Sequence, residues 1–120
     1  MVKALFDTNI LIDFLSGRPE ARREIDLHED RAISIVTWME VMVGATPDTE
    51  ARLRGFLSGF EVVDIDQDGA EAAVDLRRRH RIKLPDALIW AAARRSGALL
   101  VTRNTRDFPV GDPGIRAPYA

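Results

Sequence analysis

The most constraining feature of this sequence is an opening apolar run that ends abruptly at Asp7-Thr8-Asn9 and then restarts, interrupted only by Asp13. Residues 2–15 read VKALFDTNILIDFL. An apolar segment of strand length is followed at once by one of helical length, so the pattern predicts a buried strand and then a helix, with Asp7 at the strand's carboxyl end. Open α/β sheets bind their ligands at that edge. Asp7 therefore either caps the helix, as Asp often does, or faces a cleft and binds a cation.

Length and composition favour one folded domain over residues 1–120. The chain has 120 residues and no cysteine. This length allows a core that needs neither disulfides nor a structural metal, and the lack of cysteine excludes thiol catalysis and zinc-finger spacings. No apolar stretch is long enough to cross a bilayer, and the opening run is a poor signal peptide. We therefore expect a cytoplasmic protein without membrane contacts.

Helical and extended patterns alternate along the rest of the chain. We expect further strands over residues 31–36, 60–65 and 98–102, and helices over residues 20–28, 37–43, 49–59, 67–80 and 85–95, before a tail with at most one short edge strand. Strands separated by helices imply βαβ units. The expected fold is therefore a three-layer α/β/α, PIN-like architecture with a central, mainly parallel sheet of four to five strands.

Two of the expected helices have distinctive patterns. The last one contains ALIWAAA, residues 87–93, which is apolar on nearly every side and should lie against the sheet. In the helix over residues 67–80, Ala70, Ala73, Val74 and Arg77 follow the spacing of one helix face. Asp66 directly precedes that helix and is a suitable cap for it.

Four acids occupy comparable places in the expected sheet. Asp7 ends the first strand, Glu40 starts the helix after the second, Asp86 starts the last helix, and Asp107 lies in the loop after the fourth strand. Parallel strands bring such residues to one edge. Four carboxylates gathered there would repel one another unless a divalent cation neutralised them. Since the chain has no cysteine and only two histidines, the expected ion is oxygen-seeking, Mg²⁺ or Mn²⁺ in its place.

Each of these acids also has a purely structural interpretation. Asp7 can cap the first helix, and Thr37 with Glu40 matches the Thr-x-x-Glu capping box. Asp86 suits the positive end of a helix, and Asp107 can fold its own turn. Their shared place at one edge of the sheet favours a joint role as metal ligands and catalytic acids.

The charge distribution supports nucleic-acid binding only locally. The net charge is −2, but bases concentrate in RRRHRIK, residues 77–83. This basic run fits either the solvated end of a helix or a surface that holds phosphates without reading sequence. A polyanion held there would bind modestly and with a marked salt dependence. The candidate phosphate contacts are Arg77, Arg78, Arg79, Arg81 and Lys83.

Four segments taken together resemble the PIN-domain ribonucleases, and more narrowly the VapC-type toxins of type II toxin–antitoxin pairs. They are DTN, TWMEVMVG, LPDALIWAAA and TRNTRDF, in that order. The resemblance implies a Mg²⁺-dependent endoribonuclease that cleaves RNA with metal-activated water and is inhibited by a cognate VapB-type antitoxin. It also implies catalytic and metal-binding roles for Asp7, Glu40, Asp86 and Asp107, supported by Thr8, Asn9, Thr102 and Asn104. Family members differ in whether the residue matching Asn104 or Asp107 supplies the fourth ligand.

Two stretches carry more apolar side chains than a small domain can bury. Residues 10–15 and 38–43 are apolar on more than one helical face. Contiguous exposed apolar surface usually marks a partner site. We therefore expect a homodimer contact and the antitoxin groove to share this surface.

Other acidic-pocket proteins fit the sequence less well. A phospho-receiver domain needs an acid pair after the first strand and a lysine after the last, whereas this chain has a lone Asp7 and the loop 103–107 without lysine. An aspartyl-phosphate hydrolase needs Asp-x-Asp, and a nucleotide-cofactor enzyme needs a glycine-rich turn. The remaining alternative is a PIN-like interaction module without activity, which RNA cleavage assays with and without Mg²⁺ would distinguish from a nuclease.

Overall fold

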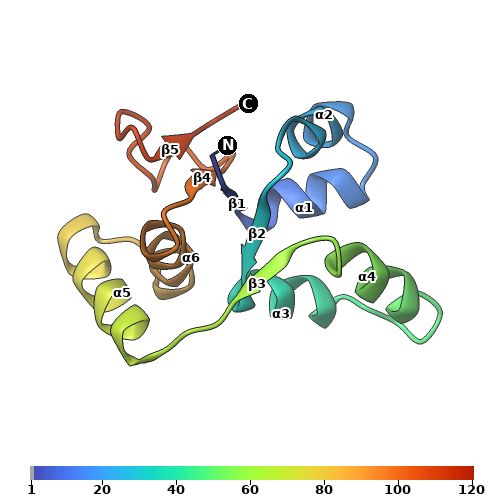
Figure 1. Ribbon diagram of the computed structural model, residues 1–120, viewed down its shortest axis with the longest axis horizontal. Coiled ribbons are helices and arrows are strands. Elements are labelled where there is room, and N and C mark those ends of the chain that lie inside the picture. The colour runs from blue at the N-terminus through green and yellow to red at the C-terminus, as the bar shows by residue number, and fades with distance from the viewer. Residues whose placement is uncertain (1) are drawn as a thin grey trace.

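A five-stranded parallel sheet forms the centre of the protein. The computed structural model describes residues 2–120, and within this range six helices surround the sheet (Figure 1). The strands are β1 (Ala4–Phe6), β2 (Arg31–Ser34), β3 (Glu61–Val63), β4 (Leu99–Val101) and β5 (Ile115–Arg116). The helices are α1 (Thr8–Leu15), α2 (Pro19–Leu27), α3 (Ile35–Val43), α4 (Glu50–Leu57), α5 (Gln67–His80) and α6 (Leu84–Arg95).

The strand order is β3-β2-β1-β4-β5, with every neighbouring pair parallel. Strand β1 is central, and its Leu5 is in register with Ala32 of β2 and Leu100 of β4. Because β1 is buried on both faces, its side chains are apolar without alternation, as expected for a parallel sheet. The short edge strand expected in the tail is present as β5, so the predicted parallel sheet is confirmed.

The two faces of the sheet are covered by different helices, which gives the three predicted layers. Leu5 points into a core with residues of α5 and α6, while Ala4 and Phe6 point into a second core with residues of α1, α2 and α4. Figure 1 shows α5 and α6 on one side of the sheet and α1, α2 and α4 on the other. Helix α3 contributes Val36 to the first core and Val41 to the second.

Helix α6 lies against the sheet, as the sequence predicted. Six of its residues are buried, four of them alanines whose small side chains allow close packing. Trp90 is 1% exposed and meets the ring of Phe108 edge-on at 5.8 Å between ring centroids. This contact holds the start of the C-terminal tail against the helix.

Helix α3 begins two residues earlier than the sequence predicted. The hydroxyl Oγ of Ser34 accepts a hydrogen bond from the backbone N–H of Val36 at 3.1 Å, so Ser34 is the N-cap. The predicted strand over residues 31–36 therefore ends at Ser34, and the Thr37–Glu40 capping box is wrong. Serine is as strong a cap as threonine, and it outweighs the strand preference of the β-branched residues that follow.

Helix α5 is capped as predicted but turns a different stripe inward. Asp66 Oδ1 accepts a hydrogen bond from the N–H of Gly69 at 2.7 Å. The buried residues of α5 are Gly69, Ala73 and Leu76, so the predicted stripe was displaced by about one residue. Val74 instead lies on the outer face, where it is 41% exposed.

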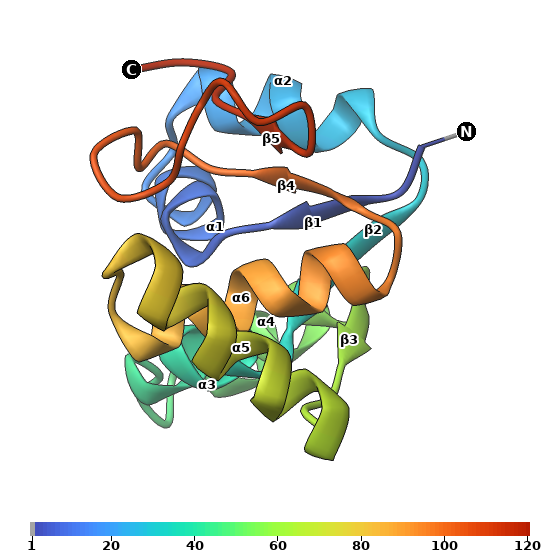
Figure 2. The ribbon, with the colours of Figure 1, turned by 90° about the vertical axis from the view of Figure 1, so that its left-hand side faces the viewer.

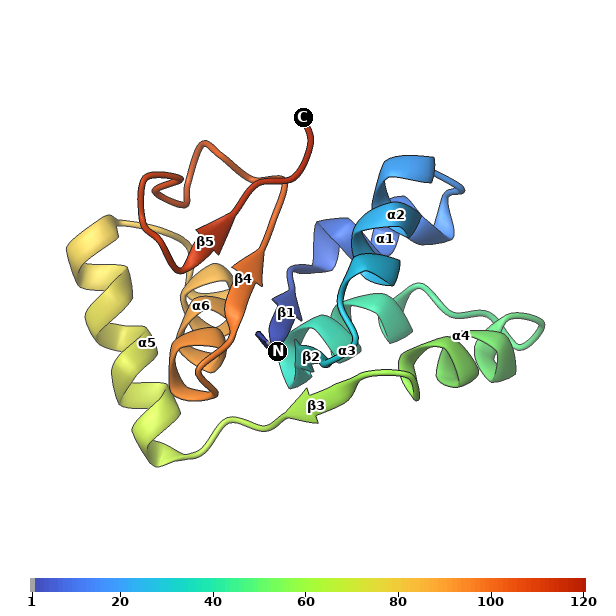
Figure 3. The same ribbon diagram turned by 45° about the horizontal axis from the view of Figure 1, so that its top comes forward.

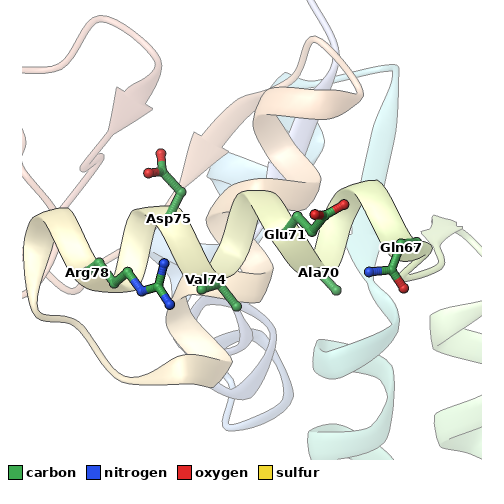
Figure 4. A pocket seen from close by; sticks show the side chains of 6 residues that line it. All are labelled: Gln67, Ala70, Glu71, Val74, Asp75 and Arg78. Atoms are coloured by element: carbon green, nitrogen blue, oxygen red, sulfur yellow. The ribbon is translucent and has the colours of Figure 1, made fainter.

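The outer face of α5 carries a hollow of about 380 Å³, and all of its lining side chains come from this one helix (Figure 4). They are Gln67, Ala70, Glu71, Val74, Asp75 and Arg78. None of the four predicted site acids lines it, so this hollow does not mark the predicted site.

The chain after β5 runs toward α1 and α2 (Figure 3). The hydroxyl of Tyr119 donates to Asp13 of α1, and the guanidinium of Arg18, between the two helices, bonds the carbonyl oxygen of Ala120. Among residues 2–120, no helix combines the length and apolar character needed to span a membrane.

Candidate active site

Asp7 lies at the carboxyl end of β1 and is almost completely buried, with 4% of its surface exposed. It is the N-cap of α1, since its Oδ1 accepts a hydrogen bond from the Thr8 N–H at 2.8 Å. Its Oδ2 accepts from the hydroxyl of Thr102 at 2.7 Å and from the amide of Asn9 at 3.1 Å. The structural and the functional interpretation of Asp7 are therefore compatible, because one carboxylate oxygen caps the helix while the other is held by Asn9 of α1 and by Thr102, directly after β4.

The environment of Asp7 disfavours its charged form. Burial raises the pKa of Asp7 to about 6, and the bonds from Thr102 and Thr8 only partly oppose this. The negative charges of Asp86 and Glu40 push the pKa in the same upward direction. A raised carboxylate pKa that results from burial and from nearby acids is typical of a functional site.

Asp86 belongs to the same electrostatic cluster. It lies in the first turn of α6, one position later in the helix than predicted because the helix begins at Leu84. Burial raises the pKa of Asp86, the acids Asp107 and Glu40 raise it further, and Lys83 opposes them. In Figure 2, the carboxyl ends of β1 and β4 and the start of α6 lie on the same side of the molecule. Asp7 and Asp86 therefore lie at the same edge of the sheet, and Glu40 and Asp107 are near enough for their charges to act on Asp86.

Glu40 reaches this edge from the second turn of α3 rather than from the predicted first turn. The hydroxyl of Thr8 donates to Glu40 Oε1 at 2.6 Å and lies 2.9 Å from the hydroxyl oxygen of Thr37. Since the single Thr8 hydrogen goes to Glu40, Thr37 donates to Thr8. Glu40 is exposed to solvent, but this chain of hydroxyls fixes its direction relative to Asp7.

The loop after β4 carries the remaining predicted residues. Thr102 is fully buried, and its hydroxyl oxygen accepts the N–H of Asn104 at 2.9 Å while it donates to Asp7. The amide of Asn104 donates to Asp107 Oδ2 at 3.0 Å, and its oxygen accepts the N–H of Asp107 at 3.2 Å. Asp107 thus folds its own turn with Asn104, and it also acts on the charge of Asp86.

The donor set at this edge fits a hard divalent cation. Its candidate ligands are carboxylate, hydroxyl and amide oxygens, which are the atoms that Mg²⁺ and Mn²⁺ prefer. Within residues 2–120, no three acidic or histidine side chains converge closely enough to hold one ion by themselves. Mg²⁺ does not require such a cage, because it usually keeps several waters and binds through one or two carboxylates together with substrate phosphates.

The basic run extends from the end of α5 to the start of α6. Arg77 donates to the carbonyl oxygen of Ile82 at 2.7 Å, and Arg79 pairs with Asp75 at 3.1 Å. These bonds within the chain reduce the availability of two of the five predicted phosphate contacts. The other three, Arg78, Arg81 and Lys83, form no ion pair with another side chain of residues 2–120.

Sequence reasoning missed two ion pairs, each between a largely buried carboxylate and a partly exposed arginine. Arg103 forms two bonds to Asp13, at 2.8 and 3.2 Å. Glu24 is 5% exposed, and it accepts two bonds from Arg116 and interacts with His28. A partial signal was present for the first, because Asp13 follows Asn9 by four residues and interrupts an apolar helix. The second pairs residues 92 positions apart and leaves no local pattern.

Comparisons with known proteins agree with this geometry. Residues 4–110 match the family model described as PIN domain. The tRNA(fMet)-specific endonuclease VapC of Shigella flexneri is 36% identical over 120 residues, which cover 90% of this chain and 91% of the relative.

Solved structures give the same result. A toxin–antitoxin complex from Klebsiella pneumoniae contains a chain that is 51% identical, with a TM-score of 0.92 and 98% of each chain covered. DNA-bound VapBC from Salmonella typhimurium gives 29% identity and a TM-score of 0.78, with 97% of this chain and 96% of that chain covered. The buried Asp7 lies at the edge of a parallel sheet, with the acids Glu40, Asp86 and Asp107 near it. Together with the family match and these relatives, this arrangement shows that the chain belongs to the PIN-domain family, in its VapC-type branch.

Proposed function

We propose that this protein is a Mg²⁺-dependent endoribonuclease toxin that is inhibited by a cognate VapB-type antitoxin. The observation that supports this best is the mutual repulsion among Asp7, Asp86 and Glu40 at the carboxyl edge of the sheet, with Asp7 almost fully buried. A fold maintains such repulsion at a cost in stability, and a site that binds a cation gives a reason for it. We also propose that residues 1–120 form one domain.

Asp7 and Asp86 would hold Mg²⁺, with Glu40 and Asp107 beside them and Asn104 as an alternative to Asp107. When bound, the ion would lower the pKa of a water molecule and neutralise charge on the scissile phosphate. Glu40 would accept the proton of the attacking water, since its direction is fixed by Thr8.

Positions of the supporting residues suggest how the chain keeps Asp7 ready. Thr102 and Asn9 both donate to the same oxygen of Asp7, Oδ2, while the Thr8 N–H holds Oδ1. These donors favour the charged carboxylate in a buried place that would otherwise protonate it. Arg78, Arg81 and Lys83 would hold flanking phosphates of the RNA by charge alone.

Transfer RNA is the first substrate to test, because the relative from Shigella flexneri is named a tRNA(fMet)-specific endonuclease. The experiment incubates purified tRNA with the protein in Mg²⁺ and in excess EDTA. Cleavage should require the metal and should be lost in Asp7→Asn and in Asp86→Asn. Asp48→Asn, which alters an exposed acid in the turn before α4, is the matched control and should cleave normally.

Cleavage that survives EDTA, or that survives both substitutions, contradicts the proposed chemistry. Complete inactivity of the folded wild-type protein on tRNA, ribosomal RNA and messenger RNA would instead support the interaction module without activity.

The proposed antitoxin and homodimer contacts involve an apolar surface on α1 and α3. Its members are Ile12, Leu15, Met39 and Val43, which are 44%, 38%, 48% and 87% exposed. Exposed apolar side chains concentrated on two adjacent helices favour a partner. Met39→Ser combined with Val43→Ser should weaken antitoxin capture and shift light scattering toward the monomer, whereas Val110→Ser, at an exposed valine of the tail, should change neither.

A further inference from the structure

We propose that the Asp13–Arg103 ion pair, closed over by Tyr119, positions the loop that carries Thr102, Asn104 and Asp107. This inference rests on the proposed function, because it assigns the pair a role in setting the geometry around Asp7. We call this arrangement of Asp13, Arg103 and Tyr119 the clasp.

Arg103 contacts two successive turns of α1. Its backbone N–H donates to Asn9 Oδ1 at 3.2 Å, and its guanidinium bonds Asp13 through Nε at 2.8 Å and through a terminal nitrogen at 3.2 Å. Asn9 and Asp13 are four residues apart, so they lie on the same face of the helix. One residue of the loop is therefore fixed at three atoms to the helix that Asp7 caps.

Tyr119 closes the ion pair from the C-terminal tail. Its hydroxyl donates to Asp13 Oδ2 at 2.9 Å, and the guanidinium carbon of Arg18 lies 4.4 Å from the centre of its ring. The Asp13 side chain is only 13% exposed as a result. A two-pronged bond between arginine and carboxylate that is partly shielded from water holds its geometry better than an exposed pair.

The consequence for the site follows from what flanks Arg103. Thr102 on one side donates to Asp7 at 2.7 Å, and Asn104 on the other side holds Asp107 by two bonds. Because Arg103 is fixed to α1, the hydroxyl of Thr102 is kept at bonding distance from Asp7. Removing a group that orients a metal-binding side chain typically costs about 10- to 100-fold in metal affinity or activity.

An RNA contact is the obvious alternative role for Arg103. However, Asp13 neutralises the charge of Arg103 at short range. The Nε and one terminal nitrogen of the guanidinium already donate to the Asp13 carboxylate. The two roles predict different kinetics. A phosphate contact acts on RNA binding and its salt dependence, whereas a positioning residue acts on turnover.

The test compares Arg103→Met and Asp13→Asn with wild type in a Mg²⁺-dependent RNA cleavage assay. Both variants should lower kcat by roughly 10- to 100-fold, the usual effect of removing a group that orients a ligand. KM should change by less than about 2-fold, and the slope of log affinity against log salt should stay the same. Arg95→Met, which removes an exposed pair with Asp66 at the far end of α6, is the matched control and should retain wild-type kcat.

Hydrogen exchange gives a second readout that does not depend on activity. In Arg103→Met, the backbone N–H groups at positions 103 and 104 should exchange faster than in wild type, while the amides of α5 and α6 should remain protected. A variant that fails to fold would lose protection everywhere. In that case Tyr119→Phe, which removes one hydroxyl and keeps the ring, tests the clasp with a smaller loss of stability.

The outcomes separate the clasp from the proposed function. If Asp7→Asn is inactive but Arg103→Met and Tyr119→Phe keep wild-type kcat, the clasp is overturned and the nuclease is not. A raised KM together with a salt slope reduced by about 1 would make Arg103 a phosphate contact and would also overturn the clasp. If Asp7→Asn still cleaves, the proposed function fails, and the exchange of the Asn104 amide then decides on the clasp alone.

Discussion

The hydroxyl of Thr102 donates to the carboxylate of Asp7 at 2.7 Å, although 95 residues separate the two along the chain. This bond joins the carboxyl ends of β1 and β4, which are paired in parallel at the centre of the sheet. Both residues are buried, so the bond is protected from competing water. It opposes the effect of burial, which by itself would protonate Asp7 at an even higher pH.

Asp7→Asn should stabilise the metal-free protein at neutral pH. The folded protein keeps the Asp7 proton up to about pH 6, against 3.8 for an ordinary aspartate. The stability that the neutral acid gives is fully present below pH 3.8 and is lost as pH rises through about 6. Ionised Asp7 therefore costs about 3 kcal/mol at neutral pH. We expect a net gain of only about 1 kcal/mol in Asp7→Asn, because the N–H₂ group that takes the place of Oδ2 cannot accept the bonds from Thr102 and Asn9.

Chemical denaturation in EDTA at about pH 7.5 and about pH 4 checks this prediction. The gain should be present at the higher pH and absent at the lower one. A variant that is less stable than wild type at both values would contradict the prediction and show that the bonds accepted by Asp7 outweigh the cost of burying its charge.

Mg²⁺ should raise the melting temperature of the wild-type protein. A ligand that binds only the folded state at about 100 times its dissociation constant stabilises it by roughly 2.7 kcal/mol. The acids at the sheet edge also repel one another less once an ion neutralises them. Differential scanning fluorimetry with and without EDTA measures the shift. It should disappear in the Asp7→Asn, Asp86→Asn double variant and persist in Asp48→Asn, and an equal shift in all three proteins would mean that Mg²⁺ binds elsewhere.

Thr102→Val should move the acidic limb of the pH–activity profile upward. Valine keeps the shape of threonine but cannot donate to Asp7, so the pKa of Asp7 rises above its wild-type value of about 6. The enzyme then needs a higher pH to ionise Asp7, and stability should fall by about 1 to 3 kcal/mol because the N–H of Asn104 loses its acceptor. Profiles of kcat/KM against pH provide the measurement, with Thr105→Val as the control at an exposed residue of the same loop. An unchanged acidic limb would count against the role given to this hydroxyl.

Glu24→Gln should destabilise the fold without changing the activity of the folded molecules. Burial alone would raise the pKa of Glu24, but bonds from Arg116 and His28 outweigh it and hold the pKa below its usual value. Glu24→Gln weakens the bonds that Arg116 donates to a buried acceptor, and because the Arg116 side chain is 42% exposed and can be hydrated, we expect a cost of about 1 to 3 kcal/mol.

Because the pKa of Glu24 is lowered on folding, this contribution is present above its unfolded value of 4.5 and is lost as pH falls below it. Urea denaturation of Glu24→Gln at about pH 7 and about pH 3 should show a large difference from wild type only at the higher pH. Glu20→Gln, at a half-exposed pair with Arg18, should leave stability close to that of wild type.

The sequence by itself determined the order of elements and the identity of the four acids. Asp7 follows a run that is apolar because β1 is buried on both faces. Asp86 lies in the first turn of a helix that is apolar on nearly every side because it packs between the sheet and α5. Such patterns are local, so they can be detected without knowledge of the fold. The start of α3 was misjudged because Ser34 and Thr37 are both acceptable caps, and in the structure Ser34 accepts the capping bond from Val36.

Tertiary structure alone decided how these residues meet. Thr102 and Asp7, Thr8 and Glu40, and Arg103 and Asp13 are joined by side-chain bonds between distant segments, whose partners depend on strand order and helix rotation. A hydrogen bond requires a specific distance and direction, and neither can be read from spacing along a chain. Sequence therefore supplied the acids at the sheet edge, whereas folding supplied the groups that hold them in place.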